Sequence, residues 1–467
     1  MATFTVTNLL DAGAGSLRDF INQANAMAGA DTIEFDPGLS GTISLIGGEL
    51  LITDSLSILG PGADLLTIDA QQMSRVFNID DGNDFSNPLN VTLDSLTTTG
   101  GLTEGGFEAS GGGIRSFENL TVSNSIVSGN STSGDSAQGG GIFNGYNRLR
   151  VIDSKVSNNS TSGSFSSGGG IGSNSFYTAS VDVINSTISG NSTTGDVARG
   201  GGIYGGRSSI SLSSSTVSGN STSGDAADGG GISIQGRSLT ISNSTISGNS
   251  TSGGGAEGGG IYHSAGRLNI SNSTVSGNST TAGDSEGGGI YAVGVFFYGV
   301  TLNTNNSIIA GNTVNAAGAD IFLNSSSFLA DDDDIFSSAS GTGNIIGAGD
   351  DTGNGAFNIA DGVNGNKVGT TASPVDPLLG PLQNNGGPTF TQSPLPGSPA
   401  IDMGANPQSL LTDQRGLPRE VGQADIGAVE VQPVTEPPTA VPEPTSVISL
   451  ALMGVVMGRK VLQKRSS

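Results

Sequence analysis

Residues 229–278 read GGGISIQGRSLTISNSTISGNSTSGGGAEGGGIYHSAGRLNISNSTVSGN and contain the same short unit twice. The tetrapeptide GGGI occurs seven times between Gly111 and Ile290, with successive copies 28 to 32 residues apart. A second marker, SGN or a close variant, follows each GGGI and occurs for the last time at Asn312. A repeat of this length is typical of stacked supersecondary units, in which each copy contacts only its neighbours. The shape of one unit therefore decides the fold.

The alternation of apolar and polar residues within each unit breaks once. Counted back from the marker asparagine, aliphatic side chains stand at −10, −8 and −3 in nearly every copy, and serine stands at −5 in all seven. Side chains alternate between the two faces of a strand, so positions −10 and −8 share one face and positions −5 and −3 share one face. In a straight strand these two pairs would point to opposite faces. We therefore predict a corner at −6. The residues there are Asn124, Asn185, Asn243, Asn272 and Asn306, with Asp153 and Ser214 in the other two copies.

Each unit is predicted to contain three short strands: one after GGGI, one at the LxI pattern and one after the corner. The first two are expected to be joined by a turn that often contains Gly-Arg, as at Arg207, Arg237 and Arg267, and a polar loop such as Asn220–Gly230 is expected to follow the marker. Stacked copies align equivalent positions at about 4.8 Å, which places the corner asparagines in a structural ladder. Asparagine suits this corner because it tolerates the left-handed backbone region. The predicted fold class is all-β, a right-handed parallel β-helix. A β-propeller is the alternative, but a blade needs four strands and about 40 residues.

The composition excludes several functions. The 467-residue chain has 41 acidic and 17 basic side chains, which gives a formal net charge of −24. Binding to nucleic acid needs a basic surface and is not expected. Because the chain has no cysteine and one histidine, it forms no disulfide or thiolate metal site, and no mechanism can use two imidazoles.

The ends of a stacked solenoid expose apolar interior, so caps are expected. Residues 1–100 are predicted to form an N-terminal cap and early coils, with a capping helix that begins at Ser16. An acidic residue, Asp19, stands three positions later, as suits a helix start. Residues 101–320 contain the seven repeated coils, and residues 321–380 are predicted to form irregular last coils.

Three motifs follow in order near the C-terminus: SPAID at 398–402, DQRGLPR at 413–419 and DIGAVE at 425–430. Together they resemble the choice-of-anchor Q domain, a tail that follows bacterial surface β-helices, and we assign residues 381–432 to it. The resemblance implies that an anchoring signal comes next. Residues 433–440 are a Pro-rich linker to that signal.

Residues 441–467 contain Pro442, Glu443 and Pro444, then an apolar stretch at 445–458 and four basic residues. This arrangement resembles the PEP-CTERM sorting signal. The resemblance implies an exosortase-like processing enzyme as partner and a final location at the outer surface or outside a Gram-negative cell. It also implies transient contact of 445–458 with the inner membrane.

The apolar stretch is predicted to form a short tail helix. Its 14 residues are fewer than the roughly 20 that cross a bilayer, which favours a sorting signal over the alternative of a permanent anchor. The start of the chain, MATFTV, passes directly into the β-pattern and shows no secretory signal. We therefore expect the natural start to lie upstream of Met1; export by another route, or a copy that is not sorted, are the alternatives.

Acidic residues recur in the loop before GGGI. Asp228, Glu257 and Glu286 are 29 residues apart, so they are expected to stack on neighbouring coils. Like charges at such spacing repel, and they either point into water or hold a divalent cation. Ca²⁺ is the candidate because it prefers carboxylate oxygens, and no other cofactor is expected. The same two alternatives, exposure to water or binding of a divalent cation, apply to the run Asp331–Asp334.

Three further features are expected to be structural. His263 is alone and is predicted to be an inert surface residue. A threonine column four positions before the marker is predicted to form a solvated outward stripe; its members are Thr187, Thr216, Thr245 and Thr274. Six marker asparagines fit the N-glycosylation sequon, but their place in the repeat predicts a role in the coil first.

The sequence favours a non-enzymatic function: an exported surface or matrix β-helix that serves adhesion or contacts extracellular polysaccharide. No catalytic residue is assigned, because Lys155 is the only lysine of the repeats and no group of acids with a base is evident. The alternative is a polysaccharide lyase or glycoside hydrolase of the pectin-lyase-like class, with its site in the irregular coils near 313–380. A cleft with convergent acids and a base would distinguish the two.

Overall fold

The computed structural model describes residues 1–83, 87–175, 179–295, 298–325, 337–349, 356–406 and 408–433. The chain divides into two units, Met1–Val431 and Gln432–Ser467, and only the first is described in detail. The sorting motif Pro442, Glu443 and Pro444 and the tail helix predicted after it lie outside the described residues. The acidic run Asp331–Asp334 lies outside them too.

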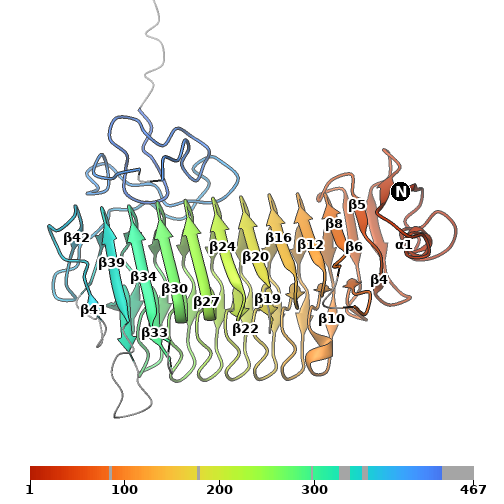
Figure 1. Ribbon diagram of the computed structural model, residues 1–467, viewed down its shortest axis with the longest axis horizontal. Coiled ribbons are helices and arrows are strands. Elements are labelled where there is room, and N and C mark those ends of the chain that lie inside the picture. Colours follow the sequence, from red (N-terminus) through yellow and green to blue (C-terminus); the bar gives the residue numbers. More distant parts are fainter. Residues whose placement is uncertain are drawn as a thin grey trace, which may run out of the picture. The chain divides into compact units, whose positions relative to one another are not determined.

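The first unit is a right-handed parallel β-helix, which confirms the predicted fold class (Figure 1). Its described strands form three long sheets, which we name A, B and C, with 21, 12 and 9 strands. Equivalent strands of successive coils pair in parallel, as where Ile188 lies opposite Val217 in sheet B. The repeat therefore sets the register, because each coil lies on a near copy of itself.

Sheet A contains β1 (Thr3–Val6), β2 (Asp31–Phe35), β4 (Leu50–Ile52), β5 (Leu56–Leu59), β7 (Phe77–Ile79), β8 (Asn90–Asp94), β11 (Ile114–Ser116), β12 (Asn119–Ser123), β15 (Ile142–Asn144), β16 (Arg148–Ile152), β19 (Ile171–Asn174), β20 (Ser180–Ile184), β23 (Ile203–Gly206), β24 (Ser209–Ser213), β27 (Ile232–Ser242), β30 (Ile261–Ser271), β33 (Ile290–Gly294), β34 (Val300–Asn305), β38 (Ile321–Ser325), β39 (Ser338–Thr342) and β41 (Ala356–Phe357). Sheet B contains β3 (Gly41–Ser44), β6 (Leu66–Asp69), β9 (Thr97–Thr99), β13 (Ile126–Ser128), β17 (Lys155–Ser157), β21 (Thr187–Ser189), β25 (Thr216–Ser218), β28 (Thr245–Ser247), β31 (Thr274–Ser276), β35 (Ile308–Ile309), β40 (Ile345–Ile346) and β42 (Lys367–Val368). Sheet C contains β10 (Leu102–Thr103), β14 (Ser131–Thr132), β18 (Ser160–Thr161), β22 (Ser192–Thr193), β26 (Ser221–Thr222), β29 (Ser250–Thr251), β32 (Ser279–Thr280), β36 (Thr313–Val314) and β37 (Ala317–Gly318).

Sheet C corrects the predicted unit. The residues directly after the marker were expected to start a polar loop, but they pair coil to coil as two-residue strands, as in β22 and β26. The two strands on either side of the expected Gly-Arg turn both belong to sheet A. In β27 and β30 they merge into one continuous strand of 11 residues, so no turn forms at Arg237 or Arg267.

The corner lies where the parity break predicted it. The corner residues all have a positive φ of 48° to 54°, and they are Asn124, Asp153, Asn185, Ser214, Asn243, Asn272 and Asn306. Their side chains form only part of the expected ladder. Asn306 Nδ2 donates to Asn272 Oδ1 at 2.8 Å, whereas the exposed Asn124 donates to Asp94 Oδ1 instead.

A continuous amide ladder is formed by the marker asparagines. Each Nδ2 donates to the Oδ1 of the next marker at 2.8–3.0 Å, along Asn130, Asn159, Asn191, Asn220, Asn249, Asn278 and Asn312. The ladder ends on Asp320, whose Oδ1 accepts from Asn312 Nδ2 at 2.8 Å. All seven amides are buried, so in the folded chain they are enclosed and hydrogen-bonded rather than open to a glycan.

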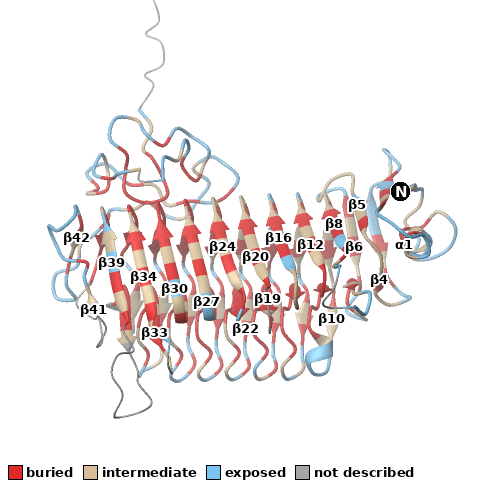
Figure 2. Ribbon diagram, viewed as in Figure 1, coloured by how far each residue is buried: buried red, intermediate tan, exposed pale blue. Residues whose placement is uncertain are grey.

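The aliphatic positions form one core along the coil interior (Figure 2). Ile246, at −3 in its copy, is completely buried, as the predicted inward face requires. The N-terminal cap is also confirmed: α1 (Leu17–Asn25) begins after Ser16, whose Oγ accepts from Asp19 N at 3.2 Å. A single turn of 3₁₀ helix lies at Phe107–Ala109. In the part of the chain that the structure describes, no helix is long and apolar enough to cross a membrane.

Candidate functional site

Residues 376–431, which we name the C-terminal segment, pack on the outer face of sheet B (Figure 1, blue). Thr216 Oγ1 donates to Phe390 O at 2.6 Å, and Thr274 Oγ1 accepts from Ala428 N at 3.2 Å. Thr245 lies between them and is buried like the other two. The prediction of a solvated threonine stripe is therefore wrong for these three residues, because the chain covers its own hydroxyl column.

The motifs that resemble the choice-of-anchor Q domain hold this segment together. Asp413 forms a salt bridge with Arg415 at 2.7 Å and accepts from Glu430 N at 3.0 Å, which joins DQRGLPR to DIGAVE. Arg419 is completely buried and donates to the carbonyl oxygens of Asp425 and Gly427. Burial lowers the pKa of Arg419, and the surrounding carboxylates partly oppose this shift. The roles seen for these residues are thus structural.

A groove of about 590 Å³ opens where the edge of the C-terminal segment meets the uncovered part of sheet B. It is lined by Ala63, Asn124, Ser125, Ile126, Asp153, Ser154, Lys155, Asn185, Thr187, Ser189, Ser218, Pro388 and Phe390. Ile126, Lys155 and Thr187 continue the register column that Thr216 and Thr245 occupy under the segment. The groove is thus the open half of a column whose other half is covered.

The lining combines exposed polar side chains with one aromatic ring. Lys155 and Asp153 are exposed on one wall, and the Phe390 ring is 52% exposed on the other. Pockets for small ligands combine apolar or aromatic surface with a few placed polar groups, as this groove does. Glycoside hydrolysis usually needs two carboxyl groups, and the described residues that line the groove include one.

The loop acids stack as predicted. Asp228 Oδ1 accepts from Glu257 N at 3.1 Å, and a Glu257 carboxylate oxygen accepts from Glu286 N, so each carboxylate binds the N–H of the next coil. Asp228 also pairs with Arg199 at 2.7 Å. Burial raises the pKa of Glu257 to about 8, with further contributions from the Glu286 and Asp228 charges. Burial raises the pKa of Asp228 as well, against the effect of Arg199.

Of the two alternatives for this column, exposure to water does not apply to Asp228, which is buried, and Ca²⁺ binding stays a prediction. Among the described residues, the group of three acidic side chains whose ligand atoms lie within 4.8 Å of one another is a different one: Asp80, Asp81 and Glu118. Sequence reasoning missed this group because Asp80 and Asp81 come from the early coils, which lack the regular repeat, so no spacing relates them to Glu118 in the first repeated coil. Sequence reasoning missed the groove because the C-terminal segment is not part of the repeat, so the spacing does not predict which coils it contacts.

His263 is completely buried and not on the surface, which corrects the prediction. Its strand, β30, places it opposite Ile234 and Ala292 on the inward face. Burial lowers the pKa of His263 to about 4, so the imidazole is neutral at pH 7. Enclosed in the core, it cannot reach a substrate.

No protein-family model matches the chain. No curated protein matches it either. Among solved structures, the crystal structure of pectate lyase Pel9A is similar, with a TM-score of 0.44 and 12% sequence identity. The match covers 92% of this chain and 97% of that one. Similarity at this level says nothing about the activity of this protein.

Proposed function

We propose that this protein is an exported, non-enzymatic β-helix that contacts extracellular polysaccharide through the groove beside the C-terminal segment. The observation that carries the proposal is the composition of that groove: polar strand residues on one wall and the exposed Phe390 ring on the other. Sugars offer both hydroxyl groups and apolar ring faces, so they match a lining of this kind.

Lys155 should make the groove bind acidic glycans more tightly than neutral ones. It is the only lysine of the repeats, and it projects from sheet B among hydroxyl and amide side chains. An acidic glycan would gain a charge-assisted contact there that a neutral glycan would not. Asp153 is the one carboxylate among the described lining residues, so apart from Lys155 the remaining polar groups of the groove are hydroxyl and amide groups that carry no negative charge.

The C-terminal motifs support the proposed location. Resemblance to the choice-of-anchor Q domain and to the PEP-CTERM signal favours export, processing by an exosortase-like enzyme and display at the cell envelope or outside the cell. Residues 445–458 would contact the inner membrane only until that processing. Contact with polysaccharide at such a location amounts to adhesion or matrix assembly.

Binding of defined oligosaccharides, measured by calorimetry, tests the proposal. Phe390→Ala is expected to raise the Kd at least tenfold for all ligands, and Lys155→Gln is expected to weaken uronic-acid oligosaccharides more than neutral ones. Matched controls are Phe165→Ala and Lys367→Gln, which alter an exposed phenylalanine and an exposed lysine outside the groove. Unchanged affinity in both groove variants would refute the binding site. Release of shortened or unsaturated products would instead establish the lyase or hydrolase alternative.

A further inference from the structure

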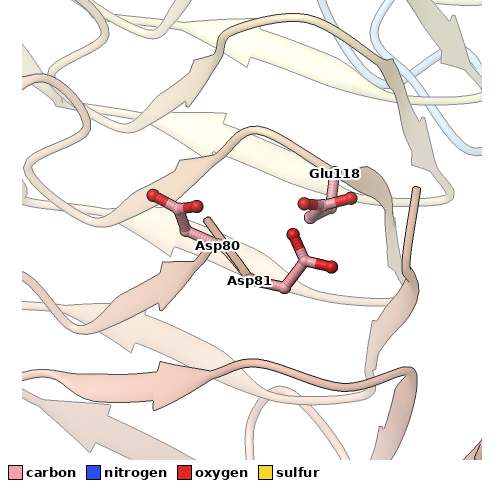
Figure 3. Close-up of side chains that lie close together, drawn as sticks. All are labelled: Asp80, Asp81 and Glu118. Carbon is pink, nitrogen blue, oxygen red and sulfur yellow. The ribbon is translucent and has the colours of Figure 1, made fainter. Parts of the chain in front are cut away.

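Three acidic side chains, none of which lines the groove, meet where the last early coil lies against the first repeated coil. Asp80 and Asp81 directly follow β7, and Glu118 lies between β11 and β12. β7 and β11 are paired neighbours, with Ile79 opposite Ser116. The chain therefore leaves sheet A at the same place in both coils, which brings the three carboxylates together (Figure 3).

Backbone N–H groups hold one oxygen of each carboxylate. Asp80 Oδ1 accepts from Gly82 N at 2.8 Å, and Asp81 Oδ1 accepts from Asn83 N at 2.7 Å. Glu118 Oε2 accepts from Leu89 N at 2.8 Å. Each side chain is thereby fixed by one oxygen, and its rotamer is set before any ligand arrives, which lowers the entropic cost of binding.

Glu118 supplies independent evidence for a ligand. The residue is 0% exposed, and Oε1 has no hydrogen-bond partner among the described residues. Figure 3 shows its carboxylate facing that of Asp81. Buried polar atoms nearly always have a partner, and an isolated buried carboxylate is strongly unfavourable. Burial raises the pKa of Glu118 to about 7, and the Asp81 charge adds to that shift.

The nearest positive side chain does not neutralise the three carboxylates. Arg115 Nη1 is 4.0 Å from Asp80 Oδ2, at the limit of an ion pair, and its Nη2 is 2.6 Å from Glu108 Oε2. The guanidinium therefore already has a closer carboxylate partner. Three carboxylates with one distant, shared arginine leave a net negative charge.

We propose that Asp80, Asp81 and Glu118 bind one Ca²⁺ ion that ties the last early coil to the first repeated coil. The three ligand atoms lie within 4.8 Å of one another, close enough for one cation to contact all three. Ca²⁺ accepts carboxylate oxygens in an irregular arrangement, whereas Mg²⁺ needs a near-ideal octahedron and keeps most of its waters, so Ca²⁺ is the proposed ion. The cation would give Oε1 of Glu118 its missing partner and replace repulsion among the carboxylates by attraction. The inference is independent of glycan binding, because it uses none of the groove residues.

Calcium binding by the full chain tests the inference. After treatment with EDTA and its removal, calorimetric titration with CaCl₂ should show one site per chain, and Ca²⁺ should raise the Tm more than equal Mg²⁺. Glu118→Gln and Asp81→Asn should each weaken that site at least tenfold. Glu34→Gln, an acid-to-amide change at an exposed position of β2, should leave it unchanged.

Two results would overturn the inference: no Ca²⁺ uptake by the wild type at millimolar concentration, or an unchanged site in both variants. If Asp81 and Glu118 instead share a proton, the wild-type Tm will not respond to Ca²⁺, which also refutes the site. Measuring the Tm of Glu118→Gln in EDTA shows whether the variant folds. There Glu118→Gln should be at least as stable as the wild type at pH 8, because it removes a buried charge and keeps the oxygen that accepts from Leu89 N.

Discussion

Gln414 Oε1 accepts a hydrogen bond from Thr245 Oγ1 at 2.6 Å, although the two residues are 169 positions apart. The Nε2 of the same side chain donates to Thr216 Oγ1 and to Thr389 Oγ1, both at 2.9 Å. One buried amide thus fastens the C-terminal segment to two successive coils. It also fixes the position of Phe390, whose main-chain oxygen accepts from Thr216, and so it defines one wall of the groove.

Gln414→Leu should loosen the C-terminal segment. The change keeps the volume but leaves the hydroxyl groups of Thr216 and Thr245 with fewer partners, at about 1–3 kcal/mol for each buried group left unsatisfied. We expect a lower Tm and faster proteolysis within residues 376–431. Gln383→Leu, at an exposed position in the same segment, is the control. Equal proteolysis of both variants would show that the amide is not the fastening.

Ile246→Asp should unfold several coils. Ile246 is completely buried in sheet B, where a carboxylate would have no partner and would cost several kcal/mol, of the order of 2–7. Circular dichroism should show loss of β-structure or a much lower Tm. Thr240→Asp places the same charge at a half-buried position of sheet A outside the apolar core and should be tolerated. Cooperative unfolding of Ile246→Asp at the wild-type Tm would contradict the assigned inward face.

Asn220→Ala should destabilise the chain more than a change at the corner. Asn220 donates to Ile188 O and to Asn249 Oδ1, and its Oδ1 accepts from both nitrogens of Asn191. Each partner left unsatisfied costs about 1–3 kcal/mol. Chemical denaturation compares this variant with Asn185→Ser, which copies the serine that occupies the same corner at Ser214. A similar decrease in the free energy of unfolding for both variants would show that the amide ladder contributes little to stability.

Stability should fall as the pH rises from about 4.5 to about 8. The folded protein holds the Glu257 proton more tightly than the unfolded chain, because its pKa rises from 4.5 to about 8. The unfolded chain loses that proton first, and deprotonation then disfavours the folded state. Measurements of Tm in EDTA should show a shallower decline for Glu257→Gln than for the wild type. The exposed Glu104→Gln is the control, and parallel curves for all three proteins would contradict the assignment.

The mature protein should lack residues 445–467. This segment has four basic and no acidic side chains, so its removal changes the formal charge from −24 to −24 − 4 = −28. We expect cleavage near Pro442, Glu443 and Pro444 after brief retention at the inner membrane. Mass spectrometry of the protein from its own host measures the C-terminus. Abundant mature peptides that span Val441 to Met457 would show a permanent anchor instead.

The amino-acid sequence by itself determined the β-helix, its inward face and its corners. In a parallel stack each residue lies beside its equivalent in the next coil. Residues that recur at the repeat length, such as Asn243 and Asn272, are therefore predicted to be neighbours. The same logic predicted the column of Asp228, Glu257 and Glu286. The sequence also predicted a role in the coil for the marker asparagines, which the structure confirms. It did not predict their amide ladder, because a recurring Asn at Asn220 or Asn249 does not itself show that the side chain points into the core.

Only the tertiary structure decided which parts of the surface are free. Thr187 and Thr216 occupy the same place in their repeats, yet Thr216 is buried under Phe390 and Thr187 lines the open groove. The difference arises because a segment without repeats docks on a face that has them, and no period in the sequence records where such a contact falls. The contact of Asp81 with Glu118 has the same origin, since it depends on how an irregular early coil lies against the first repeated coil, and no spacing in the sequence records that.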